Sequence, residues 1–414
     1  MKTSRFFALG CAFALLCTAF SSCKDDKLII NGNLTVSEPQ TAEGASVNGT
    51  EVTFEYSGGE IALPLTMVTN APEADVVYTY SVKSNADWCV ASVNDNVLTL
   101  SVEPTAEKTE KTGTVDLAVV CSDETAELTP LTLTVNQNAF SSVLDMVIVK
   151  PGTFRFGEGK NKVDGTMYAQ DYAHDVTLTK GYYIATTVVT QKLYEEIMGK
   201  NPSYSKFVGD NYPVNKMTWS EACEFCNKLS EKEGLTPVYT PGEIITVSDG
   251  WSYMKMQDYK FDPATADNGY RLPTEAEWEF AAKGGEEGCK NLTIFAGSDV
   301  FDEVGWYTEN SKVGTSEALH EVAQKNPNTL GLYDMSGNVS EWCYDWAYKY
   351  HDELQTTDPA TDPVGAPESR NGGKIIRGGY YNGPEYKGKL WDSNYQVGPE
   401  TRSTTGIRVV RYIK

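Results

Sequence analysis

Apolar and polar residues alternate with a period of two over most of residues 50–139. The alternating runs are EVTFEYSGGEIALPL, VVYTYSV, NVLTLSV, GTVDLAVV and LTLTVNQ, and Gly, Asn and Pro separate them. This pattern, enriched in Val, Thr and Tyr, predicts an all-β sandwich. Residues 23–49 before it are polar and rich in Asn, Thr, Glu and Ser, which predicts a tether.

The pattern changes near Val143, where strand periodicity becomes rare and glycine, tryptophan and loop residues increase. Three amphipathic helices are predicted in this part, with N-caps at Thr190, Thr218 and Thr274. The last two N-caps have a glutamate three residues later, which is the spacing of a capping box. We therefore expect a second, loop-rich domain over residues 143–414.

The chain begins with the features of a secretory signal peptide. Residues 1–22 have a basic start and then about a dozen apolar residues, too few to span a bilayer. Phe20-Ser21-Ser22-Cys23 resembles a bacterial lipobox, with an incidental cysteine as the alternative, and Lys24-Asp25-Asp26 is similar to a signal for export to the cell surface. We expect lipidation at Cys23, an outer-membrane lipid anchor and display outside the cell.

The composition narrows the possible partners. The net charge of −22 becomes −24 once residues 1–22 are removed, which argues against nucleic acid and anionic lipid. Six cysteines remain besides Cys23, and they suit an oxidising compartment. Cys89 and Cys121 could form a bridge or remain two buried thiols, and the sequence leaves both open.

Three short segments of the predicted sandwich resemble a BACON domain when taken together. They are Ser84-Asn85-Ala86-Asp87-Trp88, Thr112-Gly113-Thr114-Val115 and Thr134-Val135-Asn136-Gln137-Asn138. The resemblance implies an immunoglobulin-like fold over residues 50–139 and, for the family, contact with carbohydrate. Trp88 is expected in or near the core, and no exposed aromatic platform is recognisable. We predict a spacer, with glycan contact as the alternative.

The second domain carries six family segments in order, at 146–158, 174–203, 212–231, 269–285, 325–342 and 374–411. The most specific are RLPTEAEWE and GLYDMSGNVSEW. Together they resemble the formylglycine-generating enzyme, or sulfatase-modifying factor, family over nearly all of residues 143–414. The resemblance implies an irregular α+β fold related to C-type lectins.

The family's catalytic cysteines are missing from this chain. The resemblance implies an oxidase that converts a client cysteine to formylglycine with oxygen and a copper ion on two cysteines, because Cu(I) prefers sulfur ligands. Alignment on Arg377-Gly378-Gly379 places Gly383 and Gly388 at those positions, and no cysteine follows Cys343. We therefore expect no copper, no catalytic residues and no oxidase activity.

Other residues offer no replacement chemistry. Cys223 and Cys226 have redox or metal spacing, but Cys226 lies on the apolar face of its predicted helix, which favours a structural role. His174 belongs to a family strand, and His320 and His351 lie in loops without recognisable partners. The chain also lacks a Gly-x-Ser-x-Gly nucleophile elbow.

One metal site of the family is retained in the sequence. The resemblance implies a calcium ion held by Asp334, Gly337, Val339 and Glu341, through two carboxylates and two backbone carbonyls. Such oxygen ligands suit Ca²⁺. The alternative is a hydrogen-bonded turn without metal. Ser340 replaces a tryptophan that the family places beside its reactive pocket, which further weakens an enzymatic role.

Residues 380–405 would occupy the family's active-site face. The aromatic residues there that we expect to include ligand contacts are Tyr380, Tyr381, Tyr386, Trp391 and Tyr395. Rigid amphipathic rings with polar neighbours on a glycine-rich backbone are typical of a contact surface. The arrangement resembles the binding face of lectin-fold proteins diversified by retroelements. We expect at least two rings to pack in the core and the others to form a ligand face or more packing.

These observations favour a cell-surface lipoprotein in which a β-sandwich spacer displays a non-catalytic, lectin-like domain. Its ligand would be an extracellular glycan or protein. The alternative is a structural component of an envelope complex of the gliding or secretion type, in which lipoproteins of this family take part. An active formylglycine-generating oxidase is the least favoured function, because both cysteines are missing.

Overall fold

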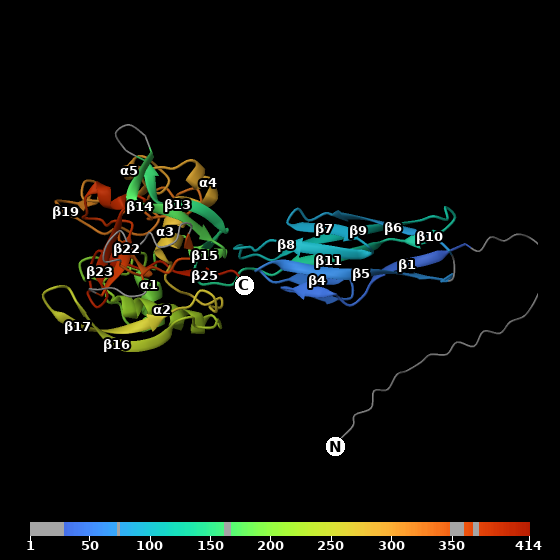
Figure 1. Cartoon of the computed structure of the whole chain (residues 1–414), viewed down its shortest axis with the longest axis horizontal. Helices are drawn as coiled ribbons and strands as arrows, with labels where there is room; N and C mark the ends of the chain where they lie inside the picture. Colours follow the sequence, from blue (N-terminus) through green and yellow to red (C-terminus); the bar gives the residue numbers. More distant parts are fainter. Residues whose placement is uncertain (1–28, 73–74, 161–166, 348–359, 367–371) are drawn as a thin grey trace, which may run out of the picture.

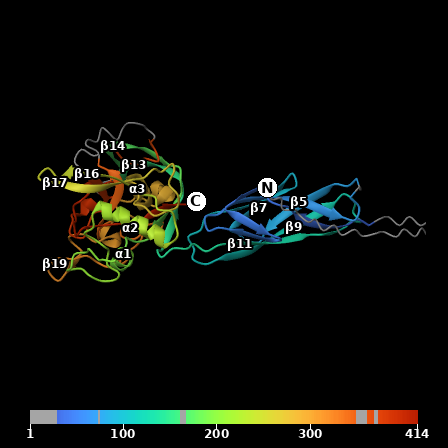
Figure 2. The ribbon, with the colours of Figure 1, turned by 90° about the horizontal axis from the view of Figure 1, so that it is seen from below.

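A computed structural model describes residues 29–72, 75–160, 167–347, 360–366 and 372–414. The predicted signal peptide, Cys23, the first residues of the predicted tether and His351 lie outside this part of the chain. The described structure is mostly β with few helices. A β-sandwich and a larger, irregular domain lie end to end along the long axis (Figures 1 and 2).

Two sheets form the sandwich. The six-stranded sheet has the order β10 (Glu127–Thr129), β1 (Asn31–Val36), β5 (Gly59–Thr69), β8 (Val97–Val102), β7 (Cys89–Asn94), with β2 (Thr41–Glu43) also paired to β5. The five-stranded sheet has the order β3 (Ala45–Asn48), β4 (Glu51–Phe54), β11 (Leu131–Gln137), β9 (Lys111–Cys121), β6 (Tyr78–Ser84).

The alternation in the sequence becomes the inside and outside of this sandwich. In β8, Leu98, Leu100 and Val102 are buried while the residues between them are only partly covered. They share one core with Leu117 and Leu133 of the other sheet. Successive side chains of a strand point to opposite faces, so the period-two pattern buries one complete face. The predicted sandwich is thus formed, and its immunoglobulin-like classification stays a prediction.

The predicted tether is too long. The structure places β1, β2 and β3, within residues 31–48, in the two sheets. Leu34 is buried in the sandwich core although the segment is polar overall, and Asn33 pairs with Val68 in the antiparallel ladder of β1 and β5. A few inward-facing apolar residues and backbone pairing therefore suffice to order this polar segment.

Several small sheets and short helices build the larger domain. Its sheets, in strand order, are β12 (Met146–Val149), β15 (Tyr182–Ala185), β25 (Val410–Tyr412); β13 (Gly152–Lys160), β14 (Met167–Leu178), β21 (Ala360–Thr361); β16 (Thr240–Ser248), β17 (Tyr253–Lys260); β18 (Lys312–Val313), β19 (Ser316–Glu317); and β23 (Ser393–Val397), β22 (Gly373–Arg377), β20 (Ser340–Trp346), β24 (Thr405–Gly406). Its helices are α1 (Gln191–Met198), α2 (Trp219–Lys232), α3 (Glu275–Ala282), α4 (Gly285–Lys290), α5 (Phe301–Val304) and the 3₁₀ helix η2 (Glu385–Gly388).

The three predicted helices form with the predicted caps. Thr190 accepts from the Leu193 amide before α1, and Gly199 closes that helix in the left-handed region at φ 72°. Complete capping boxes precede α2 and α3. These local hydrogen bonds satisfy amides that would otherwise lack partners at the helix starts.

The two domains meet across a packed junction. The Tyr183 hydroxyl donates to the Thr105 carbonyl of the sandwich at 3.0 Å. The Arg411 guanidinium lies over the rings of Tyr56 and Phe140, at 5.4 and 4.6 Å from their centroids. An ion pair of 2.7 Å joins Lys108 to Asp145 at the surface. The sandwich is therefore joined to the second domain by side-chain contacts as well as by the chain itself.

Candidate functional site

The predicted ligand face begins at a tight turn after β22. Gly378 and Gly379 have φ values of 95° and 74°, which favour glycine. A Cβ atom at Gly379 would lie 2.8 Å from the backbone of Lys387, so this turn also allows η2 to approach closely. The Ser340 hydroxyl, at the position where the family has tryptophan, donates to the Gly379 carbonyl at 3.0 Å and holds the turn.

Buried ion pairs support the turn from below. The Arg377 guanidinium reaches two carboxylates of α3, Glu275 at 2.7 Å and Glu279 at 2.8 Å, and all three side chains are buried. These partners hold the pKa of Arg377 above its usual range. The pKa of Glu279 is lowered because Lys283 and Arg377 outweigh its burial. The predicted ligand face is therefore supported by buried ion pairs whose charges neutralise one another.

The five predicted aromatic residues divide into two groups. Tyr381 is 6% exposed and stacks edge-on against Phe207, with ring centroids 5.5 Å apart. Trp391 is 4% exposed and lies against Gly159, where a Cβ would overlap its ring. These two rings pack in the interior, as expected for at least two of the five. Tyr386 and Tyr395 are more than half exposed, and Tyr380 is half-buried.

Neighbouring rings lie against Gly383 and Gly388, the two positions predicted to align with the family's cysteines. A Cβ atom at Gly388 would lie 2.3 Å from the ring of Phe301, and one at Gly383 would lie 2.9 Å from the ring of Tyr380. Phe301 is fixed in turn by Phe295 and Tyr307, stacked at 4.5 and 4.4 Å. The loop therefore leaves no room for cysteine side chains without movement of these rings.

The predicted calcium ligands fit an ion only in part. The Glu341 carboxylate is fully engaged, because it accepts from the Arg408 guanidinium at 2.8 to 3.1 Å and from the Trp278 indole at 2.7 Å. Its side chain therefore does not fit the predicted ligand role. No three His, Cys, Asp or Glu side chains within the described residues are grouped to hold a metal.

Asp334 retains a free carboxylate oxygen. Its Oδ2 accepts from the Ala323 amide at 2.8 Å, while its buried Oδ1 has no hydrogen-bond partner among the described residues. Burial raises the pKa of Asp334 to about 6. Such an oxygen suits a cation, which would offset the burial of the charge. Calcium thus stays a prediction that depends on Asp334 and the carbonyls of Gly337 and Val339.

The surroundings of the described cysteines and of His320 favour a structural role. All six described cysteines are free thiols, including Cys89 and Cys121. Cys223 and Cys226 are fully buried in the core, and burial raises the pKa of both thiols. The His320 ring stacks on Trp306 at 3.7 Å, and its Nε2 lies 2.9 Å from the Ser311 carbonyl. None of these groups is presented as an exposed nucleophile.

The hairpin of β16 and β17 was not among the elements predicted from the sequence. Its turn exposes Trp251 and Tyr253, the aromatic residues with the highest exposed fractions in the described structure. The available signal was Asp249-Gly250 between two alternating runs, EIITVS and SYMKMQ, a typical hairpin pattern.

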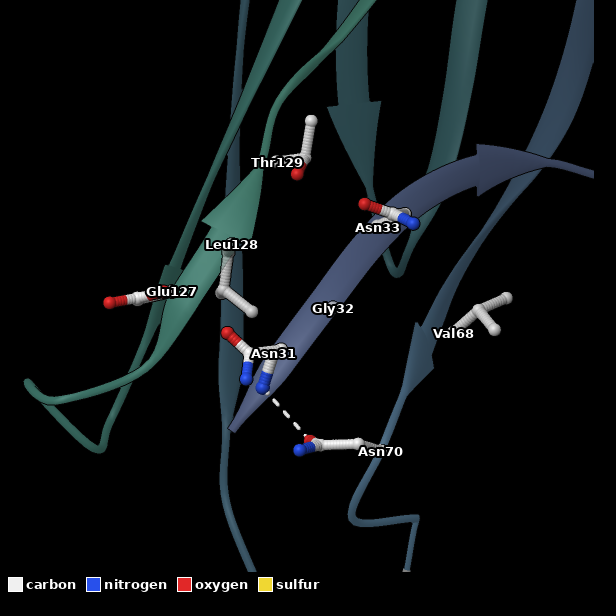
Figure 3. A pocket seen from close by; sticks show the side chains of 8 residues that line it. All are labelled: Asn31, Gly32, Asn33, Val68, Asn70, Glu127, Leu128 and Thr129. Atoms are coloured by element: carbon white, nitrogen blue, oxygen red, sulfur yellow. Dashed lines mark hydrogen bonds between the residues drawn. The ribbon is translucent and has the colours of Figure 1, made fainter. Parts of the chain in front are cut away.

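A polar groove lies on the sandwich, where β1 runs between β5 and β10 (Figure 3). Its volume is about 460 Å³, and its lining residues are Asn31, Gly32, Asn33, Val68, Asn70, Glu127, Leu128 and Thr129. The Asn31 amide donates to Asn70 Oδ1 at 2.9 Å across one end (Figure 3). No motif in the sequence predicted this groove, because part of its lining belongs to the segment interpreted as a tether.

The fold and its retained landmarks define a class of protein: a loop-rich domain built like a formylglycine-generating enzyme. Residues 132–413 match the family model of the sulfatase-modifying factor enzyme 1-like domain, and the chain belongs to this family. The prediction from the motifs is confirmed. The BACON-like and lipoprotein assignments stay predictions. Within the described residues, none of the helices has the length and apolar character needed to cross a membrane.

Three relatives illustrate the range of this similarity. The chaperone protein LppX of Paenibacillus barcinonensis is 37% identical over 280 residues, which cover 64% of this chain and 89% of that protein. The formylglycine-generating enzyme of Streptomyces coelicolor is 38% identical over 124 residues, covering 27% of this chain and 36% of the enzyme. The structure of Treponema denticola variable protein 1 matches with a TM-score of 0.50 and 29% identity, covering 64% of this chain and 94% of that one.

Proposed function

We propose that this protein is a lipid-anchored protein of the outer cell surface whose family domain binds an extracellular glycan or protein without oxidase chemistry. The BACON-like, immunoglobulin-like sandwich serves as the spacer between the anchor at Cys23 and this domain. The end-to-end arrangement of the two domains supports such a spacer (Figure 1). The lipobox-like sequence and the net charge of −22 support a solvated exterior location.

The observation that carries this proposal is the filled space beside Gly383 and Gly388. A copper site of the family needs two thiolates, and here the rings of Phe301 and Tyr380 occupy the volume into which such side chains would project. The scaffold around this point is nevertheless retained, including the ion pairs of Arg377 with Glu275 and Glu279. A retained scaffold with a filled reaction centre supports a change from catalysis to binding.

The exposed remainder of this face supplies the proposed contacts. Tyr386 and Tyr395 present amphipathic rings to solvent, at 53% and 56% exposure. The buried Tyr381 and Trp391 hold the loop from inside. Similarity to Treponema denticola variable protein 1 supports, by analogy, a fixed frame that presents changeable residues. Calcium at Asp334 is proposed as a structural ion, to be tested by a calcium-dependent rise in melting temperature that Asp334→Asn abolishes.

The loss of oxidase chemistry is tested with a peptide that contains Cys-x-Pro-x-Arg. The full-length chain, purified in detergent and incubated with Cu(I) and oxygen, should produce no formylglycine. The Streptomyces coelicolor enzyme, which is a relative of this chain, serves as the positive control. Turnover by the full-length chain would overturn the non-catalytic part of the proposal.

Ligand binding is tested on an array of host glycans and mucins in the presence of calcium. The wild-type chain is compared with the Tyr386→Ala/Tyr395→Ala variant, because these exposed side chains can be removed without opening the core. Binding by the wild type would support the proposed function, and weaker binding by the variant would assign the contact to this face. No binding on any array, together with a stable membrane-protein partner in pull-downs, would favour the envelope-complex alternative instead.

A further inference from the structure

The turn between β16 and β17 presents two aromatic side chains that the core does not use. Trp251 is 97% exposed and Tyr253 is 85% exposed. Large aromatic side chains are usually at least partly covered, because their burial contributes strongly to stability. Two neighbouring aromatic rings exposed to solvent therefore indicate a binding surface more strongly than a single exposed apolar residue does.

The turn that carries these rings is held by its own hydrogen bonds. Asp249 Oδ1 accepts from the backbone amides of Trp251 and Ser252, both at 2.7 Å. Its Oδ2 accepts from the Ser252 hydroxyl at 3.1 Å. These bonds lower the pKa of the Asp249 carboxyl. The Trp251 backbone is thus ordered before any ligand arrives, which reduces the entropy that binding must remove.

The base of the hairpin is fixed to the domain. Val247 and Met256, on its inner face, are buried in the main core. Val247 lies against Gly372 and Met256 lies against Gly398, where Cβ atoms would come within 2.4 Å of their side chains. The Ser220 hydroxyl of α2 donates to the Gln257 carbonyl at 2.6 Å. The inner face therefore anchors the hairpin and leaves its outer face and turn free.

The turn lies at the end of the molecule that is farthest from the sandwich. In Figures 1 and 2 the hairpin extends away from the domain junction, on the side opposite to β1 and β10. A chain anchored before β1 would hold the two rings away from its own membrane. This position disfavours insertion into that membrane and favours a ligand outside the cell.

The chemistry of the surface favours a carbohydrate over a protein. Two aromatic side chains offer at most about 500 Å², whereas a stable protein interface buries about 800 Å² on each partner. A sugar ring can stack on the face of a single aromatic side chain. The negative face of the aromatic ring attracts the weakly positive C–H groups of a pyranose. The polar side chains on the outer face of the hairpin can hydrogen-bond to a sugar: Thr246, Ser248 and Lys255.

The charge of the chain narrows the class of sugar. The net charge of −22 repels sulfated and carboxylated polymers. The exposed Asp249 stands beside Trp251, and both lysines of the hairpin are engaged. Lys255 donates to the Thr246 hydroxyl at 2.7 Å, and Lys260 pairs with Asp258 at 2.5 Å. We propose that Trp251 and Tyr253 form a stacking platform for a neutral, pyranose-based polysaccharide. This inference rests on the proposed role in extracellular ligand binding and adds the ligand class and a second contact surface to it.

The test is affinity electrophoresis of the full-length chain in gels that contain neutral polysaccharides, with laminarin, galactomannan and xylan as probes and dextran sulfate as the anionic comparison. Wild type should be retarded by at least one neutral polymer and not by dextran sulfate. Trp251→Ala/Tyr253→Ala should weaken that binding by roughly tenfold or more. Tyr386→Ala/Tyr395→Ala is measured beside it as the variant of the other proposed contact surface. The matched control is Val90→Ala/Val120→Ala, which removes exposed apolar side chains of the sandwich and should stay within about twofold of wild type. Far-ultraviolet circular dichroism verifies that all three variants fold.

Two results would overturn the platform. If the hairpin variant binds as tightly as wild type while Tyr386→Ala/Tyr395→Ala loses binding, recognition belongs to residues 380–405 and the proposed function stands without the hairpin. If no polysaccharide retards the wild type, the carbohydrate platform is rejected, while a protein ligand found in pull-downs would still satisfy the proposed function.

Discussion

The two domains bury their interiors by different means. In the sandwich, the described side chains of the core are apolar, and the buried polar residues between positions 31 and 139 are Thr105 and Gln137. The second domain buries whole ion pairs, such as Arg271 with Glu277 at 2.6 Å and Arg408 with Glu341 at 2.8 Å. Long paired strands satisfy their own backbone groups, whereas short elements joined by loops need side chains to hold them in place.

This difference bears on function. The loops of the second domain carry the exposed aromatic rings, and the buried ion pairs hold those loops in one conformation. Arg377 reaches α3 through two carboxylates and also donates to the Leu390 carbonyl in the loop of the predicted ligand face. A domain of this kind can change its surface residues while its charged interior preserves the frame.

The largest expected effect is that of Arg377→Met. It removes the cation that pairs with Glu275 and Glu279 but leaves their carboxylates buried. Loss of one partner of a buried ion pair costs about 3–5 kcal/mol of unfolding free energy. Denaturation followed by tryptophan fluorescence should show the second domain unfolding much earlier. A stability equal to that of wild type would mean that the ion pairs do not hold this domain together.

Leu133→Ala should produce a smaller loss, restricted to the sandwich. Leu133 is fully buried between the two sheets, and the substitution leaves a cavity that costs about 3 kcal/mol. Hydrogen exchange should report loosening across β4, β9 and β11 and little change in the second domain. Equal loosening of both domains would show that they unfold as one unit.

Asp345→Asn should change the dependence of stability on pH. Burial, with the charge of Glu275, raises the pKa of Asp345 to about 8 in the folded chain, whereas an unfolded aspartate has a pKa of about 3.9. The folded state therefore holds this proton more tightly, and the resulting stability is present below about pH 4 and is lost as pH rises through 8. The variant should melt closest to wild type at pH 4 and above it by a few degrees at pH 8.5, and the difference should grow between these two pH values.

The position of Asp345 favours asparagine as a clean replacement. Its Oδ2 accepts from the Glu275 amide at 2.8 Å, and an asparagine oxygen can accept the same bond. The matched measurement is the melting temperature of the Leu133→Ala variant, whose difference from wild type should not change between the two pH values. A parallel pH response in both variants would contradict the assignment to Asp345.

Arg411→Met should have the smallest effect, of about 1 kcal/mol. The substitution removes contacts of the cation with the rings of Tyr56, Phe140, Tyr183 and Tyr270 at the domain junction. It also removes Nε and Nη2, which have no hydrogen-bond partner within the described ranges, and this partly offsets the loss. Small-angle scattering should show a wider distribution of domain orientations, while each domain keeps its own stability.

Local patterns predicted a large part of this structure. The capping residues Thr218 and Thr274 placed two helices correctly, because a cap acts on amides only a few residues away. The alternation of apolar and polar residues placed the strands of the sandwich, because this pattern also depends only on residues that are close in sequence. It failed for residues 31–48, where pairing of β1 with β5 orders a polar segment through contacts that no local pattern contains.

The candidate site was predictable only in outline. The motifs located the face and showed that glycine stands at positions 383 and 388. They did not show that Phe301, far away in the sequence, fills the space beside Gly388. Nor did they separate Trp391, which is buried against Gly159, from Tyr395, which is exposed.

The sequence by itself determined the family, the missing thiols, the acidic charge and the positions of the main helices, since each depends on residue identity or on neighbours along the chain. The tertiary structure decided which rings face solvent, that the Glu341 carboxylate belongs to Arg408, and that the Trp251 hairpin projects from the far end. Burial and ion pairing depend on where distant segments meet in space, as for Arg408 and Glu341, which are 67 residues apart.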